Sequence, residues 1–248
     1  MEQFLIDKLN QYNIELPNKP IEREGFTRWG HNNRYWLLSV GEGYAFGDWS
    51  QDINEFVFPD NSKPINAMRK LEFCAKIQAE KERRQQEIQQ EQKKVADTAK
   101  SMFDKADFAK QEHPYLARKH VQAHCAKHNK NTNTLLIPLY DIEGELWSVQ
   151  YIDIDGNKRF LAGGRKKGCF CPIGTLTDTI YLCEGFATAA TIFEATGKYT
   201  VAAMDAGNMM PVASELVGKY PNAKIVIAAD NDWEKSDNTG VKYATEVA

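Results

Sequence analysis

The chain has 248 residues, 42% of them apolar, which is enough to bury a core in one to three domains. Its 31 basic and 34 acidic residues give a formal net charge of −3, which excludes a polycation that coats nucleic acid indiscriminately. Any site for nucleic acid must therefore be local. The five cysteines are an odd number in a chain too large to need disulfide bonds, and no long apolar run or signal peptide is present. These features predict a cytoplasmic protein without a membrane partner.

Residues 1–62 are rich in aromatic side chains and turn signals, which predicts a small β-containing module, with template DNA binding as its candidate role. Its rings must mainly fill the module's core, but one or two left on the surface could stack on single-stranded bases. The aromatic residues concerned are Trp29, Tyr35, Trp36, Tyr44, Phe46 and Trp49. We name Trp36 and Trp49 as candidate template contacts.

Residues 63–112 predict a long polar helical spacer, with helical character from about Ile65 to Gln111. In its middle, residues 81–94 (KERRQQEIQQEQKK) contain a single apolar side chain, Ile88. A helix this polar is expected to bridge solvent, over ~20 Å for that segment at 1.5 Å per residue. A dimeric coiled coil is the weaker alternative because no apolar seam persists.

Residues 113–175 predict a small antiparallel subdomain. Pro114 suits the first turn of a helix, and Glu143-Gly144 and Asp155-Gly156 are hairpin signals. Residues 113–172 contain nine Lys or Arg against five Asp or Glu. The clustered cations are candidates for phosphate binding, with a solvated loop as the alternative. They are Lys158, Arg159, Arg165, Lys166 and Lys167.

Residues 176–248 predict a parallel α/β sheet, because short apolar strands at Ile180–Cys183 and Ile225–Ala229 alternate with helical segments. Ligands of such sheets bind where the strands end, and Glu184, Asp230 and Asp232 follow these two strands directly. Their oxygen donors suit Mg²⁺ or Mn²⁺. The alternative is that the acids only cap loops or helices.

A further set of metal-binding side chains is a weaker signal. His120, His124 and His128, with Cys125, recur at helical spacing that could bind Zn²⁺. Structural zinc sites usually recruit ligands from two elements, and this segment reads as an ordinary helix. Cys169 and Cys171 alternate as small apolar residues of a strand do. Zinc is therefore not expected.

The motifs DGNKRFLAGG, KKGCFCPIG, YLCEGF, AAMDAGN and AADND, in this order, resemble the catalytic core of bacterial-type DNA primases, in which a basic subdomain precedes a Toprim domain. The segments GYAFGDW and HPYLARKHV, with the helical spacer, make the chain similar to the primases of plasmids and phages. The resemblance implies an α/β fold, α+β overall, with a Toprim-type parallel sheet flanked by helices.

The resemblance also implies roles for single residues. Glu184 corresponds to the family's acidic residue that is proposed to act in acid/base catalysis or in metal binding. Asp230 and Asp232 correspond to its metal-binding pair. Lys158 and Arg159 match the basic pair beside the nucleotide-binding region. The turn at Gly207-Asn208, within the motif AAMDAGN, adds Asn208 as a candidate nucleotide or DNA contact.

Two features depart from the family pattern. Replicative primases often have another acid where this chain has Thr188, so a further metal ligand could come from elsewhere in the chain. The candidates are Asp205, Glu234 and Asp237. No cysteine precedes Cys74, so the N-terminal module lacks the zinc ribbon of cellular primases.

The function implied is primer synthesis on a single-stranded DNA template from nucleoside triphosphates, with Mg²⁺ or Mn²⁺. A replicative helicase, in cis or in trans, is a further candidate partner. A Toprim nuclease and a non-catalytic replication accessory are the alternatives. Residues 240–248 read as the beginning of a helix that does not finish, so we expect the Toprim domain to be truncated at its C-terminus.

Overall fold

The structure is a computed structural model that describes residues 2–22, 25–40, 43–59, 67–229 and 245. The chain divides into two compact units, residues 1–85 and 86–248, which we describe separately.

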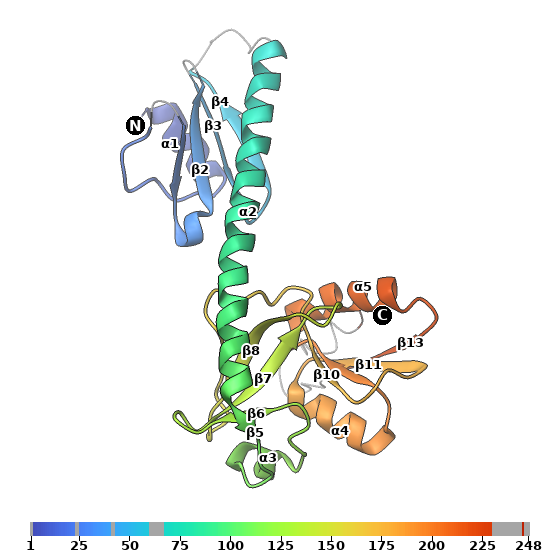
Figure 1. The fold of residues 1–248 in the computed structure, drawn as a ribbon. Coiled ribbons are helices and arrows are strands. Elements are labelled where there is room, and N and C mark those ends of the chain that lie inside the picture. Colours follow the sequence, from blue (N-terminus) through green and yellow to red (C-terminus); the bar gives the residue numbers. More distant parts are fainter. Residues whose placement is uncertain (1, 23–24, 41–42, 60–66, 230–244, 246–248) are drawn as a thin grey trace. The chain divides into compact units, whose positions relative to one another are not determined.

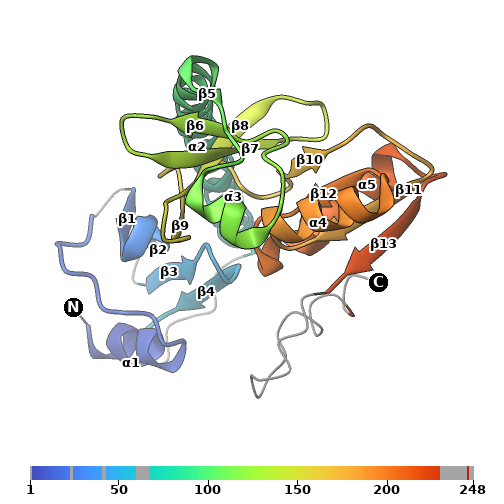
Figure 2. The ribbon, with the colours of Figure 1, turned by 90° about the horizontal axis from the view of Figure 1, so that it is seen from below.

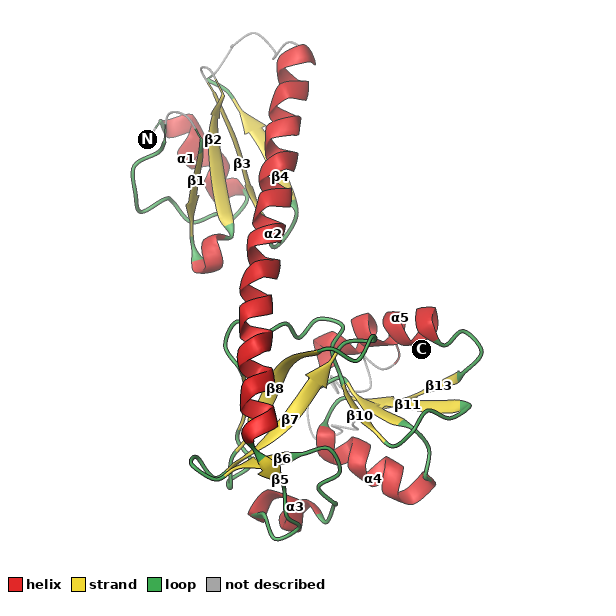
Figure 3. Ribbon diagram, in the orientation of Figure 1, coloured by secondary structure: helices red, strands yellow, loops and turns green. Residues whose placement is uncertain are grey.

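The first unit is a four-stranded antiparallel sheet with a helix on one face (Figure 3). Helix α1 (Gln3–Gln11) precedes strands β1 (Phe26–Trp29), β2 (Tyr35–Val40), β3 (Gly43–Asp48) and β4 (Ile53–Val57), and a short 3-10 turn, His31–Asn33, joins β1 to β2. Leu5 and Leu9 of α1 pack with Trp29 and Phe46 in a buried cluster. The predicted small β-containing module is confirmed.

The predicted spacer is a single helix, α2 (Ala67–Lys105). Most side chains of residues 81–94 are exposed, as their polarity predicts. Both ends are packed, however. Phe73 and Ile77 contact an apolar cluster of the first unit, and Ala99 and Phe103 are buried in the second. The helix also ends before Gln111, because the chain next pairs as a strand.

The second unit begins with a five-stranded antiparallel sheet in the order β5-β6-β7-β8-β9. The strands are β5 (Asp107–Phe108), β6 (Lys127–Asn129), β7 (Thr134–Tyr140), β8 (Leu146–Ile152) and β9 (Lys158–Phe160), and α3 (Pro114–Lys119) lies between β5 and β6 in the chain. Both predicted hairpins form. Asp141 and Asp153 each accept backbone hydrogen bonds within their turns, and the glycines of both turns have positive φ.

A second sheet follows, in the order β10-β12-β11-β13. It consists of β10 (Cys171–Ile173), β11 (Thr179–Cys183), β12 (Thr200–Ala202) and β13 (Lys224–Ala228), with α4 (Phe186–Thr196) after β11 and α5 (Met209–Lys219) after β12. Strand β11 is parallel to both β12 and β13, and β10 is antiparallel to β12. The predicted parallel sheet is confirmed.

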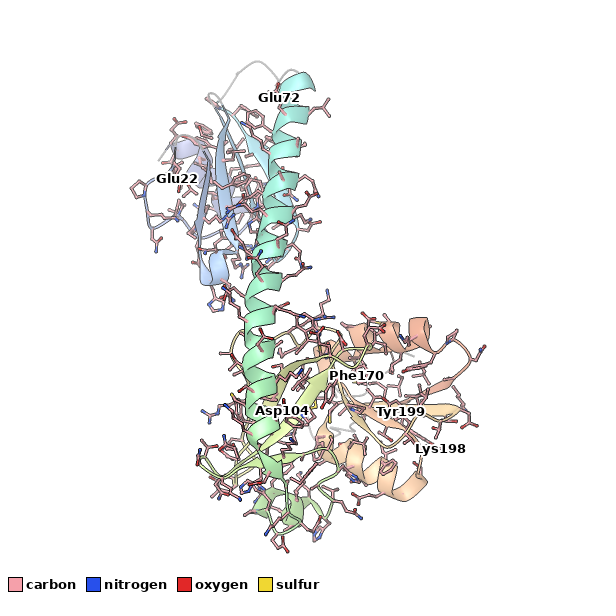
Figure 4. All side chains as sticks on the ribbon, in the orientation of Figure 1. Glu22, Glu72, Asp104, Phe170, Lys198 and Tyr199 are labelled. Atoms are coloured by element: carbon pink, nitrogen blue, oxygen red, sulfur yellow. The ribbon has the colours of Figure 1, made fainter. Side chains whose placement is uncertain are left out.

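Helices α4 and α5 cover opposite faces of this sheet, as Figure 1 shows, and Figure 2 views the unit from the α4 side. Phe186 and Ala190 of α4 pack in the cluster that also holds Cys183. On the other face, Val212 and Leu216 of α5 pack with Phe170, and Tyr199 borders this cluster (Figure 4). Because both faces are buried, the strands are apolar throughout, and polar side chains are left to the strand ends.

Candidate active site

The three parallel strands end in one row. Cys183, the last residue of β11, lies opposite Ala202 of β12 and Ala228 of β13. Glu184 follows β11 directly, and its carbonyl oxygen accepts a 2.7 Å hydrogen bond from the Met204 N–H beyond β12. The acids that follow β13, Asp230 and Asp232, lie outside the described residues. Their strand nevertheless ends beside the residue before Glu184.

Glu184 lines a cavity of about 330 Å³ between the two sheets of the second unit. On the side of the parallel sheet, Gly185, Thr188 and Met204 also line the cavity. Met204 has a φ of 73°, which is unfavourable for a side chain with a Cβ atom, so a strained residue lies beside the acid. The described residues thus include one carboxylate at this strand end with space beside it.

The antiparallel sheet brings cations to the same cavity. Lys158 of β9 lines it, and a Cβ atom added at Gly185 would lie 3.9 Å from the Lys158 Nζ. Arg159 does not line it, because alternate residues of a strand point to opposite faces of the sheet. Sequence reasoning treated Lys158 and Arg159 as one basic pair, but the structure separates them and leaves Lys158 near Glu184.

The loop between β9 and β10 holds the remaining cations, Arg165, Lys166 and Lys167, and we call residues 161–168 the basic loop. Arg165 Nη1 lies 3.8 Å from Asp141 Oδ2, and its guanidinium lies 4.8 Å from the Trp147 ring centroid. Lys166 Nζ lies 3.2 Å from Asp205 Oδ2. Lys167 is exposed. Two of the three cations are thus held near acids, in contacts that a phosphate could replace.

Comparison with known proteins identifies one domain. The family model for the Toprim domain matches residues 179–248, which begin with β11. Residues 179–248 are a Toprim domain. The predicted Toprim-type sheet, preceded by a basic antiparallel subdomain, a helix and a β-containing module, is therefore confirmed.

The chain is also similar to curated proteins. It is 35% identical over 181 residues to a DNA primase TraC from Escherichia coli, a match over 71% of this chain and 17% of that protein. A second DNA primase TraC from Escherichia coli is 37% identical over 168 residues, which cover 64% of this chain and 12% of that protein. These matches confirm the resemblance to Toprim-containing primases. The chain spans less than a fifth of the length of either relative.

A solved structure is similar to the chain at a lower sequence identity. The primase fragment of the bacteriophage T7 primase-helicase protein is 14% identical, with a TM-score of 0.41 over 54% of this chain and 59% of that chain.

Asn208, which the Gly-Asn turn suggested as a nucleotide or DNA contact, is buried in the Toprim domain and binds backbone groups. Its side chain is 3% exposed. Its amide donates to the carbonyl oxygens of Cys169 and Ala203, both at 2.8 Å, and accepts from the Gly168 N–H at 2.9 Å. This assignment is therefore corrected, because an amide with these bonds joins the end of the basic loop to β12 and has no free donor.

The alternative metal ligands are placed only in part. Asp205 lies after β12 but is paired with Lys166, and Thr188 lines the cavity beside Glu184. Glu234 and Asp237 lie outside the described residues. Within the described ranges, no group of three His, Cys, Asp or Glu side chains is placed to hold a metal ion. The proposed metal site thus depends on Glu184 together with the acids that follow β13.

The aromatic candidates of the first unit differ in exposure. Trp36 is fully buried between Phe26 and Trp49, with ring centroids 5.5 and 5.0 Å away. It has no exposed face on which a base could stack, so we withdraw it as a template contact. Trp49 is only half-buried and stays a candidate. The pattern of aromatic residues could not separate the two, because burial depends on how the sheet packs.

The histidine segment is not one helix, so that interpretation is wrong. Helix α3 ends at Lys119, His120 takes the left-handed conformation that closes it, and His128 lies in β6. His124 Nε2 lies 2.7 Å from Glu194 Oε1, and the Cys125 and Cys171 sulfur atoms are 3.1 Å apart. His124 and Cys125 thus contact other residues of the second unit, and the histidines do not share one face of a helix.

Two elements contribute cavity residues that sequence reasoning did not single out. Tyr115 and Lys119 come from α3, and Gln150 comes from β8. Their only signals were the four-residue spacing within HPYLARKHV and one polar residue inside a β-rich segment.

Across the part of the chain that the structure describes, no helix is both long and apolar enough to span a membrane.

Proposed function

We propose that the chain is the primer-synthesising part of a DNA primase, which joins nucleotides on a single-stranded DNA template in plasmid or phage replication. The observation that supports this most is the cavity in which Glu184 of the Toprim domain lies with Lys158 of the antiparallel sheet. A carboxylate next to a cation, at the end of a parallel sheet, suits a reaction in which phosphates are bound and a hydroxyl is activated. The 35% sequence identity to a DNA primase TraC supports the same reaction.

The residues suggest a division of tasks. Glu184, with Asp230 and Asp232, would hold Mg²⁺ or Mn²⁺, because three carboxylates at one strand edge are hard oxygen donors that such ions prefer. A bound divalent ion would stabilise the charge on the transferring phosphoryl group. Lys158 binds the triphosphate, and Arg159 with the basic loop binds the template backbone. The proposed partners are therefore nucleoside triphosphates and single-stranded DNA, with a replicative helicase in cis or in trans.

One assay tests the reaction. The protein is incubated with single-stranded DNA, labelled nucleotides and Mg²⁺ or Mn²⁺, and the products are separated by length. We expect short labelled oligomers whose formation depends on the template. Cleavage of the DNA without labelled products would favour a Toprim nuclease. DNA binding without either product would favour a non-catalytic accessory, and both results would contradict primer synthesis.

The basic loop provides a prediction about DNA binding. Replacing Arg165, Lys166 and Lys167 by Ala should weaken single-stranded DNA binding about equally for all sequences. Each side chain that binds a phosphate contributes roughly 0.7 to the slope of log affinity against log salt concentration, so its removal should make this slope shallower by that amount. Fluorescence anisotropy at several salt concentrations measures the slope.

A matched control is Lys100→Ala, Lys105→Ala and Lys110→Ala, which removes the same charge from exposed positions outside the loop. Equal slopes for the two triple variants would mean that the loop cations serve only their contacts with Asp141 and Asp205.

We also propose a four-part division of the chain into a template module (1–62), a spacer (63–112), a basic subdomain (113–175) and the Toprim domain (176–248). Removing residues 1–85 should lower primer initiation more than extension of an annealed primer, since only initiation needs a template reader. We choose residue 85 because Phe73 and Ile77 pack within the first unit. Equal initiation by the truncated and full chains would place template reading elsewhere.

A further inference from the structure

Two thiols from separate segments of the second unit lie in contact. The Cys125 and Cys171 sulfur atoms are 3.1 Å apart, and both cysteines are free thiols. Cys125 lies in the loop between α3 and β6, and Cys171 is the first residue of β10. The sulfur–sulfur distance of a disulfide bond is about 2.05 Å, so the two atoms need to approach each other by only about 1 Å. The pair is therefore placed to form a disulfide bond.

The register of the Toprim sheet excludes Cys183 as the partner of Cys171. Both cysteines lie opposite Ala202, on either side of it, so strand β12 stands between them. Neighbouring strands are about 4.8 Å apart, which separates the two Cα atoms by roughly 9.6 Å, whereas a disulfide bond needs Cα atoms within about 7 Å. Cys125 approaches Cys171 from outside the sheet and meets no such barrier.

The two thiols of the pair differ in how they meet a dissolved oxidant. Cys125 is half-buried, whereas Cys171 is fully buried, and this burial raises the pKa of the Cys171 thiol well above its usual range. Oxidation of a thiol by a dissolved oxidant requires exposure and thiolate character. We therefore expect Cys125 to react first, with Cys171 protected until its neighbour has changed.

The pair lies where the loop after α3 meets the Toprim sheet. In the same loop as Cys125, the Gln122 N–H and His124 Nε2 lie 2.8 and 2.7 Å from Glu194 Oε1 of α4. Cys125 also packs against the apolar cluster that contains Cys171. All of these contacts are non-covalent. A disulfide bond would join the two segments covalently across 46 positions of the chain.

We propose that Cys125 and Cys171 are a peroxide-sensitive thiol pair whose disulfide bond clamps the loop after α3 to the Toprim sheet. Hydrogen peroxide transfers one oxygen atom to the Cys125 thiol, which becomes a sulfenic acid, and one water is released. The Cys171 sulfur then attacks the Cys125 sulfur. The S–S bond forms, the S–O bond breaks, and the hydroxyl group leaves with the Cys171 proton as a second water. Two electrons thus pass from the thiols to one peroxide molecule, and a dithiol reverses the reaction.

The test uses the full chain with Cys74→Ser, because Cys74 is exposed and would itself react with peroxide or cross-link two chains. The protein is treated with hydrogen peroxide, the remaining thiols are alkylated in denaturant, and proteolytic peptides are analysed by mass spectrometry. We expect one pair of peptides joined through Cys125 and Cys171. Adding Cys125→Ser should abolish this pair, whereas Cys183→Ala, the matched control at another cysteine of the same cluster, should keep it.

Unfolding in urea tests the clamp itself. A cross-link between positions 46 residues apart restricts the unfolded chain, so the oxidised protein should unfold at a higher urea concentration than the reduced protein. Dithiothreitol should reverse this rise, and Cys125→Ser should show none. If Cys125→Ser does not fold, Cys125→Ala provides the same comparison.

Four results would overturn the inference. One is oxidation of Cys125 to a sulfinic acid while Cys171 stays a free thiol, and a second is a disulfide bond between Cys171 and another cysteine. A third is an unchanged urea midpoint in a chain that has formed the Cys125–Cys171 bond, and a fourth is an equal rise in Cys125→Ser. None of these measurements uses primer synthesis, so this inference and the proposed function can fail separately.

Discussion

Primer synthesis should fall by a factor on the order of 10² to 10³ or more when Glu184→Gln is introduced, or when Asp230→Asn and Asp232→Asn are combined. Each change keeps the shape of the side chain but removes the negative charge that would hold a divalent ion. Glu184 lies at the end of β11 on the wall of a cavity rather than in an apolar cluster, so the fold should survive. The measurement is the yield of labelled oligomers from single-stranded DNA.

The control is Asp97→Asn, an exposed acid on α2 whose charge change is the same. A second readout is thermal unfolding in millimolar Mg²⁺ or Mn²⁺. An ion that binds only the folded chain raises the melting temperature by mass action, and the double variant should lose this rise. Equal activity of Glu184→Gln and Asp97→Asn would remove Glu184 from the site. An equal rise in melting temperature with and without Asp230 and Asp232 would contradict the metal assignment.

The Asn208→Ala variant should be less stable than the wild type by about 2–4 kcal/mol. The change leaves the Gly168 N–H and the carbonyl oxygens of Cys169 and Ala203 without the partners they have in the wild type, in a region from which water is excluded. Unfolding in urea, followed by circular dichroism, gives the free energy of unfolding.

Asn157→Ala provides the matched control, because Asn157 also uses its amide on a turn but is exposed, so its loss should cost less than about 1 kcal/mol. If Asn208→Ala kept wild-type stability and lost affinity for nucleotide or DNA, Asn208 would be a binding residue, as the Gly-Asn turn suggested. Reduced stability with unchanged affinity would support its role as a clamp between the basic loop and β12.

Local patterns were sufficient for the secondary structure around the site. The predicted strands at Ile180–Cys183 and Ile225–Ala229 agree closely with β11 (Thr179–Cys183) and β13 (Lys224–Ala228). Both hairpins also form at the predicted turns, because an acid and a glycine in a short connection determine the turn locally. The order of elements then predicted the parallel sheet and the strand end at which Glu184 lies.

Other predictions failed or stayed open where contacts between distant segments decide the outcome. Trp36 and Trp49 looked equivalent in sequence, yet only the packing of the first unit buries Trp36 completely. The His120–His128 segment has helical spacing, but His120 and His124 have positive φ and His128 lies in β6, which pairs with β7. Helix α2 ends early for the same reason, since β5 pairs with β6.

The sequence by itself determined the parallel α/β sheet and the strand-end position of Glu184, because apolar periodicity and turn chemistry act over a few neighbouring residues. The Toprim domain was implied by the resemblance of its motifs to those of primases. Only the tertiary structure decided which cations and amides reach Glu184. Lys119, Gln150 and Lys158 come from α3, β8 and β9, and they meet Glu184 because two sheets pack against each other. Burial and convergence arise between residues far apart in the chain, and no local pattern contains that information.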